Sequence, residues 1–197
     1  MEKMRAILAE PRPDGRLFMG EVDQPSPLPS QALVRVKAIS LNRGEVRRAM
    51  STDNRYVPGW DLAGVVERPA GNGSGPKAGA RVVGLLPVGA WAELAAVPTD
   101  FLAELPDRVS FGQAATLPVA GLTALYVLQR VGNLLGRKVL VTGASGGTGS
   151  FVVQMARLSG ATVVGTTQHE EFTKTVKEDG AAEVVVGDPA GASRFGP

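Results

Sequence analysis

The fold is decided by one stretch, Lys138-Val139-Leu140-Val141-Thr142-Gly143-Ala144-Ser145-Gly146-Gly147-Thr148-Gly149-Ser150. The aliphatic residues 139–141 predict a short, buried parallel strand. A helix is expected from Ser150 onward, where Val152, Met155 and Ala156 form an apolar stripe. Residues 161–166 predict a second strand. Strand, glycine turn, helix and strand in this order form the first half of a dinucleotide-binding unit.

The glycines of this turn suit a phosphate site. Backbone amides at a helix N-terminus attract anions, and a side chain at Gly146 or Gly147 would hold a pyrophosphate away from them. Gly149 lets the helix lie close to the strand. The spacing departs from G-x-G-x-x-G because Ala144 occupies the first position. An ordinary glycine-rich turn is the alternative, and a P-loop is disfavoured because no lysine follows. The expected cofactor-binding residues of the turn are Gly143, Ala144, Ser145, Gly146, Gly147, Thr148 and Gly149.

The composition is that of a soluble globular protein. The 197 residues are 44% hydrophobic and 20% charged, with a net charge of +2. This charge is too small, and the basic residues too scattered, to indicate nucleic acid or acidic membranes as partners. The sequence shows neither an apolar run of transmembrane length nor the apolar core of a signal peptide. We therefore expect a cytoplasmic protein.

Metal-binding side chains are scarce. The chain has no cysteine, and its single histidine is His169, which we expect at the surface where a helix begins. Disulfides and Cys-rich zinc centres are excluded, and no metal site is expected.

The N-terminal half predicts mainly strands. Residues 4–9 and 16–22 are expected to pair across the turn Pro11–Gly15, and Val34, Val36 and Ala38 alternate with charged residues. Further strands are expected over residues 62–66, 81–86 and 90–97, with a short helix over 45–50. Many strands with little helix indicate a partly closed β-barrel over residues 1 to about 100.

Helical patterns follow the β-rich half. Ser110 is a suitable cap for a helix over residues 111–116, and Pro118 is a suitable first residue for a second helix that extends to about Val131. This second helix leads into the strand before the glycine turn.

Four ordered motifs carry a resemblance to a known family. They are Ser40-Leu41-Asn42, the segment from Val57 to Val66, the segment from Ala114 to Ala124, and the turn from Val141 to Gly149. The chain resembles the medium-chain dehydrogenase/reductase superfamily, most closely its zinc-independent quinone oxidoreductase branch. The resemblance implies an α/β plus β protein, in which a GroES-like partly open β-barrel is followed by a Rossmann dinucleotide-binding fold. It places the GroES-like substrate domain at residues 1–115 and the NADP(H)-binding domain at residues 116–197.

The zinc-dependent branch of this family differs at the positions that hold the metal. It carries a cysteine near Asn42 and a histidine where this chain has Trp60. With neither ligand, catalytic zinc is excluded on ligand count as well. The resemblance then implies an NADPH-dependent reductase that transfers hydride to a quinone or an α,β-unsaturated carbonyl without a metal.

The charge near the second strand predicts the cofactor. NAD-preferring folds place an acidic residue about 20 residues beyond the glycines, whereas this chain has Thr166, Thr167 and Gln168 there. A carboxylate would repel the 2′-phosphate by roughly 4 kcal/mol at 4 Å and an effective dielectric of 20. Its absence favours NADP(H). The lysine that related reductases use falls at Phe172, so Lys174 is expected to replace it, or else to be an ordinary solvated lysine.

The resemblance also implies three active-site residues. Asn42, Tyr56 and Thr123 fall where related reductases line the nicotinamide and substrate cleft. Tyr56 has a hydroxyl suited to orienting or protonating the substrate, or it packs in a loop before a proline. Asn42 has an amide suited to a ribose or substrate oxygen, or it caps the following helix. Thr123 lines the cleft or faces a helix neighbour.

Three neighbouring positions also bear on the pocket. Arg47 replaces a tyrosine that is frequent in relatives, which predicts a different substrate pocket. Trp60 and Asp61 are expected to wall that pocket, with a structural acceptor role for Asp61 as the alternative.

The second domain is short for this family. Residues 139–141, 162–166 and 183–186 predict three Rossmann strands, whereas the complete fold has six. We expect a fragment or a truncated product, and a free-standing form would expose a strand edge that favours a homodimer. An enoyl-thioester reductase, another zinc-independent alcohol dehydrogenase-like enzyme and a non-catalytic dinucleotide-binding module stay open as alternatives.

Overall fold

The computed structural model describes residues 2–12 and 16–188, and the chain divides into two compact units. Unit 1 is Met1–Val119 and unit 2 is Ala120–Pro197. Each unit is described by itself. The expected domain boundary, between residues 115 and 116, falls just inside unit 1, and the assignment of domain functions stays a prediction.

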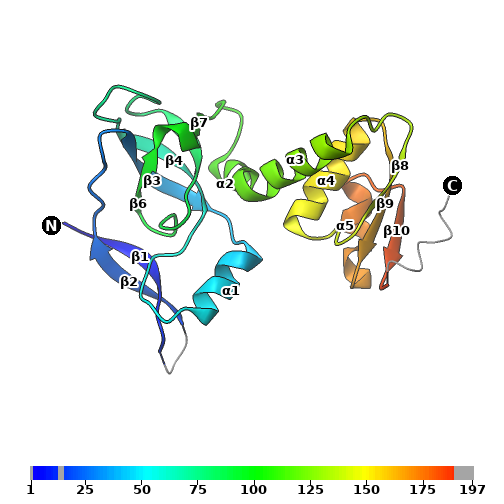
Figure 1. Cartoon of the computed structure of the whole chain (residues 1–197), viewed down its shortest axis with the longest axis horizontal. Helices are drawn as coiled ribbons and strands as arrows, with labels where there is room; N and C mark the ends of the chain where they lie inside the picture. Colours follow the sequence, from blue (N-terminus) through cyan, green and yellow to red (C-terminus); the bar gives the residue numbers. More distant parts are fainter. Residues whose placement is uncertain (1, 13–15, 189–197) are drawn as a thin grey trace. The chain divides into compact units, whose positions relative to one another are not determined.

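Unit 1 opens with the antiparallel hairpin that the sequence predicts. Strand β1 (Lys3–Ala9) pairs with β2 (Leu17–Asp23) along its full length, from Lys3 opposite Asp23 to Ala9 opposite Leu17. Residues 13–15 of the expected turn lie outside the described residues. Figure 1 shows the hairpin beside helix α1 (Arg43–Ser51).

A curled five-stranded sheet forms the body of unit 1. Its strands are all antiparallel and lie in the order β6-β3-β4-β5-β7. Alternating apolar residues turn one face inward, as the pattern at residues 34–38 predicts. The expected partly open barrel is confirmed. The strand bounds are β3 (Gln31–Ile39), β4 (Asp61–Arg68), β5 (Arg81–Leu85), β6 (Leu94–Pro98) and β7 (Leu102–Glu104), and buried core residues include Val34, Leu62, Val66, Val82, Trp91 and Val97.

Short helices close the sheet of unit 1. Helix α2 (Phe111–Ala115) buries Ala114 and Ala115 against Ala63 of β4. Its predicted cap is confirmed, because the Ser110 hydroxyl accepts a hydrogen bond from the Gln113 amide at 3.2 Å. A single 3₁₀ turn, η1 (Thr99–Phe101), and strand β7 were not predicted.

The strand predicted over residues 90–97 is wrong in its first half. Strand β6 begins only at Leu94. Before it, the Trp91 amide donates to the Pro58 carbonyl at 3.0 Å, and the Trp91 side chain is buried in the core. Only an isolated bridge, Ala92 opposite Ala6, joins this segment to β1, so no continuous strand forms, although residue types alone favour one.

The continuous helix predicted from Pro118 to Val131 is also corrected. Residues Leu117–Gly121 form a wider π-type turn, η2, and the regular helix α3 covers only Leu122–Val131. Pro118 has no amide hydrogen, and the Val119 amide donates to the Asp61 carboxyl at 2.9 Å instead of to the helix. This side-chain contact separates the two helical segments.

Unit 2 is a three-stranded parallel sheet with helices on one face (Figure 1). The strand order β10-β9-β8 is that of the first half of a Rossmann fold, which confirms the expected fold class. Both helices that follow the glycine turn pack on the face that carries Val163. The elements are β8 (Lys138–Val141), α4 (Gly147–Leu158), β9 (Thr162–Thr167), η3 (Glu170–Phe172), α5 (Thr173–Glu178) and β10 (Glu183–Val186).

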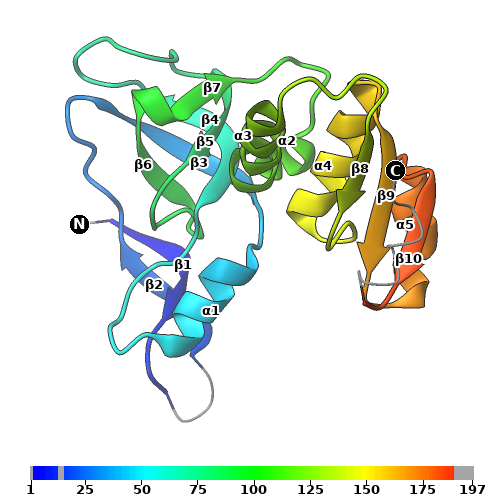
Figure 2. The ribbon, with the colours of Figure 1, turned by 45° about the vertical axis from the view of Figure 1, so that its right-hand side comes forward.

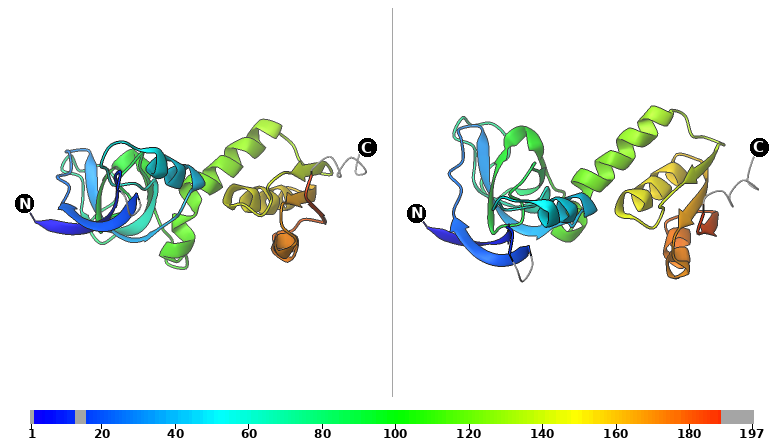
Figure 3. Two further views of the ribbon diagram at one scale, coloured as in Figure 1. Left: turned by 90° about the horizontal axis from the view of Figure 1, so that it is seen from below. Right: turned by 60° about the horizontal axis from the view of Figure 1, so that its bottom comes forward.

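Helix α3 completes this unit by packing along α4 (Figure 3). Leu128 of α3 joins Val153 and Ala156 of α4 in one buried cluster. Within the described residues, no helix combines the length and apolar character needed to cross a membrane.

Candidate functional site

The glycine turn is fixed to the end of β9. The Gly143 amide donates to the Thr166 hydroxyl at 3.3 Å, and the Ala144 amide donates to the Thr166 carbonyl at 2.8 Å. Gly143 has φ +65°, a conformation that side chains disfavour. Ala144 is fully buried. The turn is therefore held from the neighbouring strand.

The glycines of the turn have different roles. A Cβ atom at Gly149 would lie 2.1 Å from the Gly143 carbonyl oxygen and 2.8 Å from Ala144 Cα, so only glycine fits. A Cβ atom at Gly147 would meet nothing closer than Ala120 Cβ at 3.8 Å. Gly149 is thus required for packing, whereas Gly147 borders open space at the start of α4.

This open space suits a phosphate group. The first amides of a helix have no acceptor inside the helix, and Gly147, Thr148 and Gly149 are the first residues of α4. Gly143, Gly146 and Gly147 are exposed. Unpaired donors, the helix dipole and the absence of side chains form a cradle into which a pyrophosphate fits.

The end of β9 carries hydroxyls rather than a carboxylate. Thr167 is 1% exposed, and its hydroxyl lies 3.0 Å from the Ser145 hydroxyl and 3.3 Å from the His169 carbonyl oxygen. These contacts are internal to the unit and fix the turn to the strand. Gln168 is exposed and follows directly. His169 lies at the exposed start of η3.

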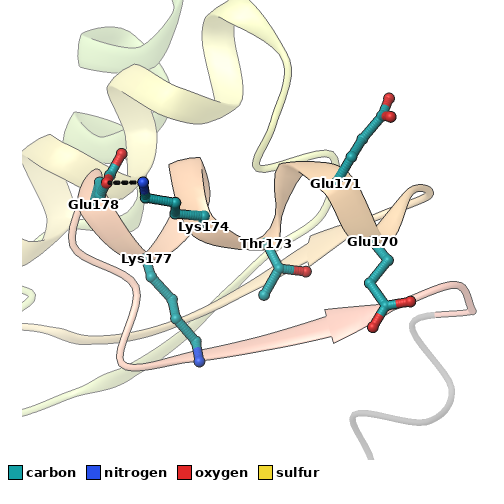
Figure 4. A pocket seen from close by; sticks show the side chains of 6 residues that line it. All are labelled: Glu170, Glu171, Thr173, Lys174, Lys177 and Glu178. Carbon is teal, nitrogen blue, oxygen red and sulfur yellow. Dashed lines mark ion pairs between the residues drawn. The ribbon is translucent and has the colours of Figure 1, made fainter.

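A surface hollow of about 490 Å³ lies over η3 and α5. Figure 4 shows Lys174 turned toward Glu178, at an Nζ–Oε1 distance of 3.7 Å, and away from Glu170 and Glu171. The Thr173 hydroxyl is buried and has no partner within residues 2–12 and 16–188. The six lining residues are Glu170, Glu171, Thr173, Lys174, Lys177 and Glu178. The hollow thus contains both charges, and Lys174 already has an acidic partner.

Thr123 lies in the first turn of α3 and is exposed. Ala120, just before this helix, is the nearest neighbour of a Cβ built at Gly147. Within unit 2, the start of α3 therefore lies close to the start of α4.

In unit 1, Asn42 belongs to a buried hydrogen-bond network around Asp61. The Asp61 carboxyl is inaccessible to solvent and accepts from three donors. These donors are the Asn42 amide nitrogen at 2.7 Å, the Ser40 hydroxyl, and the Val119 backbone amide at 2.9 Å. Three donors satisfy the carboxyl, which supports the structural acceptor role for Asp61.

Helix α1 is fixed to Trp60 through Glu45. This glutamate is 2% exposed, and its carboxyl accepts from the Asn42 backbone amide at 2.6 Å and the Trp60 backbone amide at 2.5 Å. A Cβ at Gly44 would lie 2.7 Å from the Trp60 ring, so helix and ring are in close contact. The sequence motifs assigned no role to Glu45. Its place three residues after Asn42, at the start of a helix, is the pattern that identifies it.

Tyr56 lies between the hairpin and α1. Its backbone exchanges hydrogen bonds with Ala9 of β1 at 2.9 and 3.0 Å. The Arg48 guanidinium lies 5.5 Å from the centre of the Tyr56 ring. The Tyr56 hydroxyl is buried and has no hydrogen-bond partner among the described residues. A buried hydroxyl without a hydrogen-bond partner costs about 1–3 kcal/mol.

The comparisons with known proteins agree with both units. Residues 28–107 match the model of the Alcohol dehydrogenase GroES-like domain. A quinone oxidoreductase from Pongo abelii is 36% identical over 179 residues, which are 87% of this chain and 54% of that protein. The human synaptic vesicle membrane protein VAT-1 homolog-like protein has a structure that superposes with a TM-score of 0.90 at 28% identity, covering 99% of this chain and 65% of that one.

The chain belongs to the medium-chain dehydrogenase/reductase superfamily. Its place there is in the quinone oxidoreductase-like branch. A third relative, a quinone oxidoreductase from Thermus thermophilus that was also solved in complex with NADPH, superposes with a TM-score of 0.83 at 30% identity. That match covers 98% of this chain and 64% of the other. The chain spans about half the length of the curated relatives that it matches.

The predicted site residues fall into two groups, one in each unit. Asn42 and Tyr56 both flank α1 in unit 1, whereas Thr123, the glycine turn, Thr167, Gln168 and Lys174 belong to unit 2. Their roles in binding or catalysis stay predictions. Among residues 2–12 and 16–188, no three His, Cys, Asp or Glu side chains gather in a group that would hold a metal ion.

Proposed function

We propose that this chain binds NADP(H) at the glycine turn and belongs to a reductase of quinones or α,β-unsaturated carbonyls that uses no metal. The observation that carries the proposal is the cradle at the start of α4, where Gly149 packs against the turn and Gly147 borders open space. Such a cradle fits a dinucleotide pyrophosphate. Two NADPH complexes among the structurally similar proteins support the choice of ligand.

The preference for NADP(H) over NAD(H) follows from the groups beyond β9. Thr167 and Gln168 replace the carboxylate that would hold the ribose hydroxyls of NAD. The Lys174 side chain is 85% exposed, and within residues 2–12 and 16–188 its one ion pair is with Glu178 on the same helix. Exposed pairs at this spacing contribute only about 0.3–0.5 kcal/mol, so the lysine can turn to a 2′-phosphate at little cost.

The bound cofactor would supply the hydride, and the chain would supply binding and orientation. In this proposal, Gly143, Ala144, Ser145, Gly146, Gly147, Thr148 and Gly149 surround the pyrophosphate. The roles predicted for Asn42 and for Thr123, toward the nicotinamide or the substrate, are part of the same proposal. The Tyr56 hydroxyl, which lacks a partner among the described residues, donates a hydrogen bond to the oxygen of the electron acceptor.

The test is the oxidation of NADPH in the presence and absence of 2-methyl-1,4-naphthoquinone. We expect quinone-dependent oxidation that Tyr56→Phe reduces by about tenfold or more, with NADPH affinity unchanged. The matched control is Tyr126→Phe, since Tyr126 is 61% exposed on α3 and is assigned no role. Turnover that Tyr56→Phe leaves intact would remove this tyrosine from the mechanism, and absence of turnover in the unmodified chain would contradict the proposed activity.

A further inference from the structure

Helix α1 carries two adjacent exposed arginines that form no ion pair with any described residue. Arg47 and Arg48 are both exposed. Within the described residues, neither guanidinium donates to a carbonyl or pairs with a carboxylate, and that of Arg48 contacts the Tyr56 ring. Arginine is a strong donor to carboxylates, sulfonates and phosphates because its planar fork matches two of their oxygens. Among the described residues, both guanidinium groups therefore lack an acidic partner and are available to an anion.

Among the described residues, the neighbouring acidic groups Glu10 and Glu45 are bound elsewhere. Glu10 lies 3.4 Å from both Arg12 and Arg55, so its carboxylate is shared between two cations. Glu45 is buried and accepts from backbone amides. The charged residues in the described parts of the hairpin end, of α1 and of the loop that follows are Glu10, Arg12, Arg16, Arg43, Glu45, Arg47, Arg48, Asp53 and Arg55.

Arg16 joins the hairpin to the segment that leads to Tyr56. The Arg16 guanidinium donates to the Thr52 carbonyl at 2.5 Å, which ties the hairpin end to the loop that carries Tyr56. Tyr56 in turn pairs with Ala9 of β1. Figure 2 shows α1 and this loop beside the hairpin. Of the described arginines in this region, Arg48 is the one whose guanidinium lies over the Tyr56 ring, at 5.5 Å from its centre.

Apolar side chains lie on the same helix. Val46 and Met50 stand one turn apart on α1 and are 39% and 52% exposed. Next to arginines, they suit a ligand with an apolar body and an anionic group rather than a small inorganic ion.

We infer that α1 selects an electron acceptor that carries an anionic group, with Arg47 and Arg48 binding that group and the Tyr56 hydroxyl meeting an adjacent oxygen. This inference rests on the proposed function and narrows its substrate class. The acceptor is a quinone or an unsaturated carbonyl bearing a carboxylate, sulfonate or phosphate. Arg47 and Arg48 determine which acceptor binds. They take no part in the hydride transfer itself.

The experiment compares two acceptors, 1,4-naphthoquinone-2-sulfonate and the neutral 2-methyl-1,4-naphthoquinone. The double variant Arg47→Gln/Arg48→Gln is expected to lower kcat/KM for the sulfonate by about tenfold or more, mainly through KM, and to leave the neutral quinone within about twofold. Salt is expected to weaken the sulfonate reaction alone, because it screens exposed charges. The chain has no cysteine that would add to the quinone ring.

Arg130→Gln is the matched control, because Arg130 is exposed on α3 and has no role in either proposal. This variant is expected to leave kcat/KM unchanged for both acceptors. Equal losses for both acceptors in the double variant, or no loss for either, would overturn the inference and leave the reductase proposal standing. Binding of the unmodified chain to phosphatidylserine vesicles without discrimination between the acceptors would assign the arginines to a membrane surface and also overturn it.

A calorimetric titration with naphthalene-2-sulfonate separates this inference from the proposed function, since it needs no turnover. If neither quinone is reduced but the double variant weakens naphthalene-2-sulfonate binding by about tenfold, the anion site stands and the reductase proposal fails. If the unmodified chain does not bind naphthalene-2-sulfonate, the anion site is wrong whatever the quinones show.

Discussion

Gly149 and Gly147 stand two positions apart, yet they differ in what surrounds them. A Cβ at Gly149 meets backbone atoms at 2.1 and 2.8 Å, which flexible side chains cannot relieve. A Cβ at Gly147 meets only a side-chain carbon at 3.8 Å. The sequence shows both as members of one glycine cluster, and only the backbone geometry separates the packing glycine from the one that borders the cradle.

Gly149→Ala is expected to lower the free energy of unfolding by about 2 kcal/mol or more, because α4 must move away from the turn. Urea denaturation measures the change. Gly112→Ala is the control, since nothing lies within 4 Å of a Cβ there and alanine favours its helix α2. A Gly149→Ala protein as stable as the unmodified chain would show that the turn relaxes easily.

Asp61 is a second residue at which the exact side-chain atoms decide stability. Asp61→Asn replaces an acceptor oxygen with a donor in front of Ser40, Asn42 or Val119, and so leaves a buried donor unpaired. We expect a loss of about 3 kcal/mol in the free energy of unfolding. The control is Asp53→Asn, which changes an exposed carboxylate. Equal stability of the two variants would contradict the structural role assigned to Asp61.

At the scale of elements, strand β1 is joined to the chain before β6 by an exposed charge contact. The Arg5 backbone amide donates to Glu93 at 2.9 Å, and the Arg5 guanidinium lies 2.7 Å from the same carboxylate. The amide and guanidinium donors lower the pKa of Glu93 below its usual value of 4.5. A lowered pKa in the folded state stabilises the fold above 4.5, and this stabilisation is lost as the pH falls through the folded pKa.

Glu93→Gln is therefore expected to lower the melting temperature slightly at neutral pH and not at a pH well below 4.5. Thermal unfolding of both proteins across this range measures the difference. Glu21→Gln on the hairpin is the control, because Glu21 forms no ion pair in the described residues. A difference between Glu93→Gln and the unmodified chain that persists in acid would mean that the contact does not depend on the charge of the carboxylate.

The sequence predicted most elements because their signals are local. The β-branched run at 139–141 and the alternation at 34–38 are properties of a few adjacent residues, and both strands are present. The predictions for residues 90–93 and 118–121 failed where distant groups take single amides: the Pro58 carbonyl accepts from Trp91, and the Asp61 carboxyl accepts from Val119. Contacts with such distant acceptors cannot be predicted from the residues of the segment itself.

The candidate site was likewise predictable only where its sequence signal is local. The glycine turn has a local signature and lies between β8 and α4 as expected, whereas the roles of Asn42, Tyr56 and Thr123 stay predictions. The position of Arg48 over the Tyr56 ring and the buried, unpaired Tyr56 hydroxyl depend on how α1 packs against the hairpin. No spacing in the sequence reveals them.

At the scale of the whole molecule, the central claim is that unit 2 binds NADP(H) through the cradle at the start of α4. The unit has the strand order, the glycine geometry and the uncharged end of β9 that this cofactor requires. Family membership agrees, but the curated relatives are about twice as long as the matched part. Direct binding to this chain is therefore the decisive property.

The most direct measurement is a calorimetric titration of NADPH and NADH into the unmodified chain and into Gly147→Ala, with Gly112→Ala as control. The account predicts saturable NADPH binding, NADH binding weaker by about tenfold, and a loss of about tenfold or more for NADPH in a normally folded Gly147→Ala protein. An affinity for NADPH that Gly147→Ala leaves unchanged, or no binding of either dinucleotide, would contradict it.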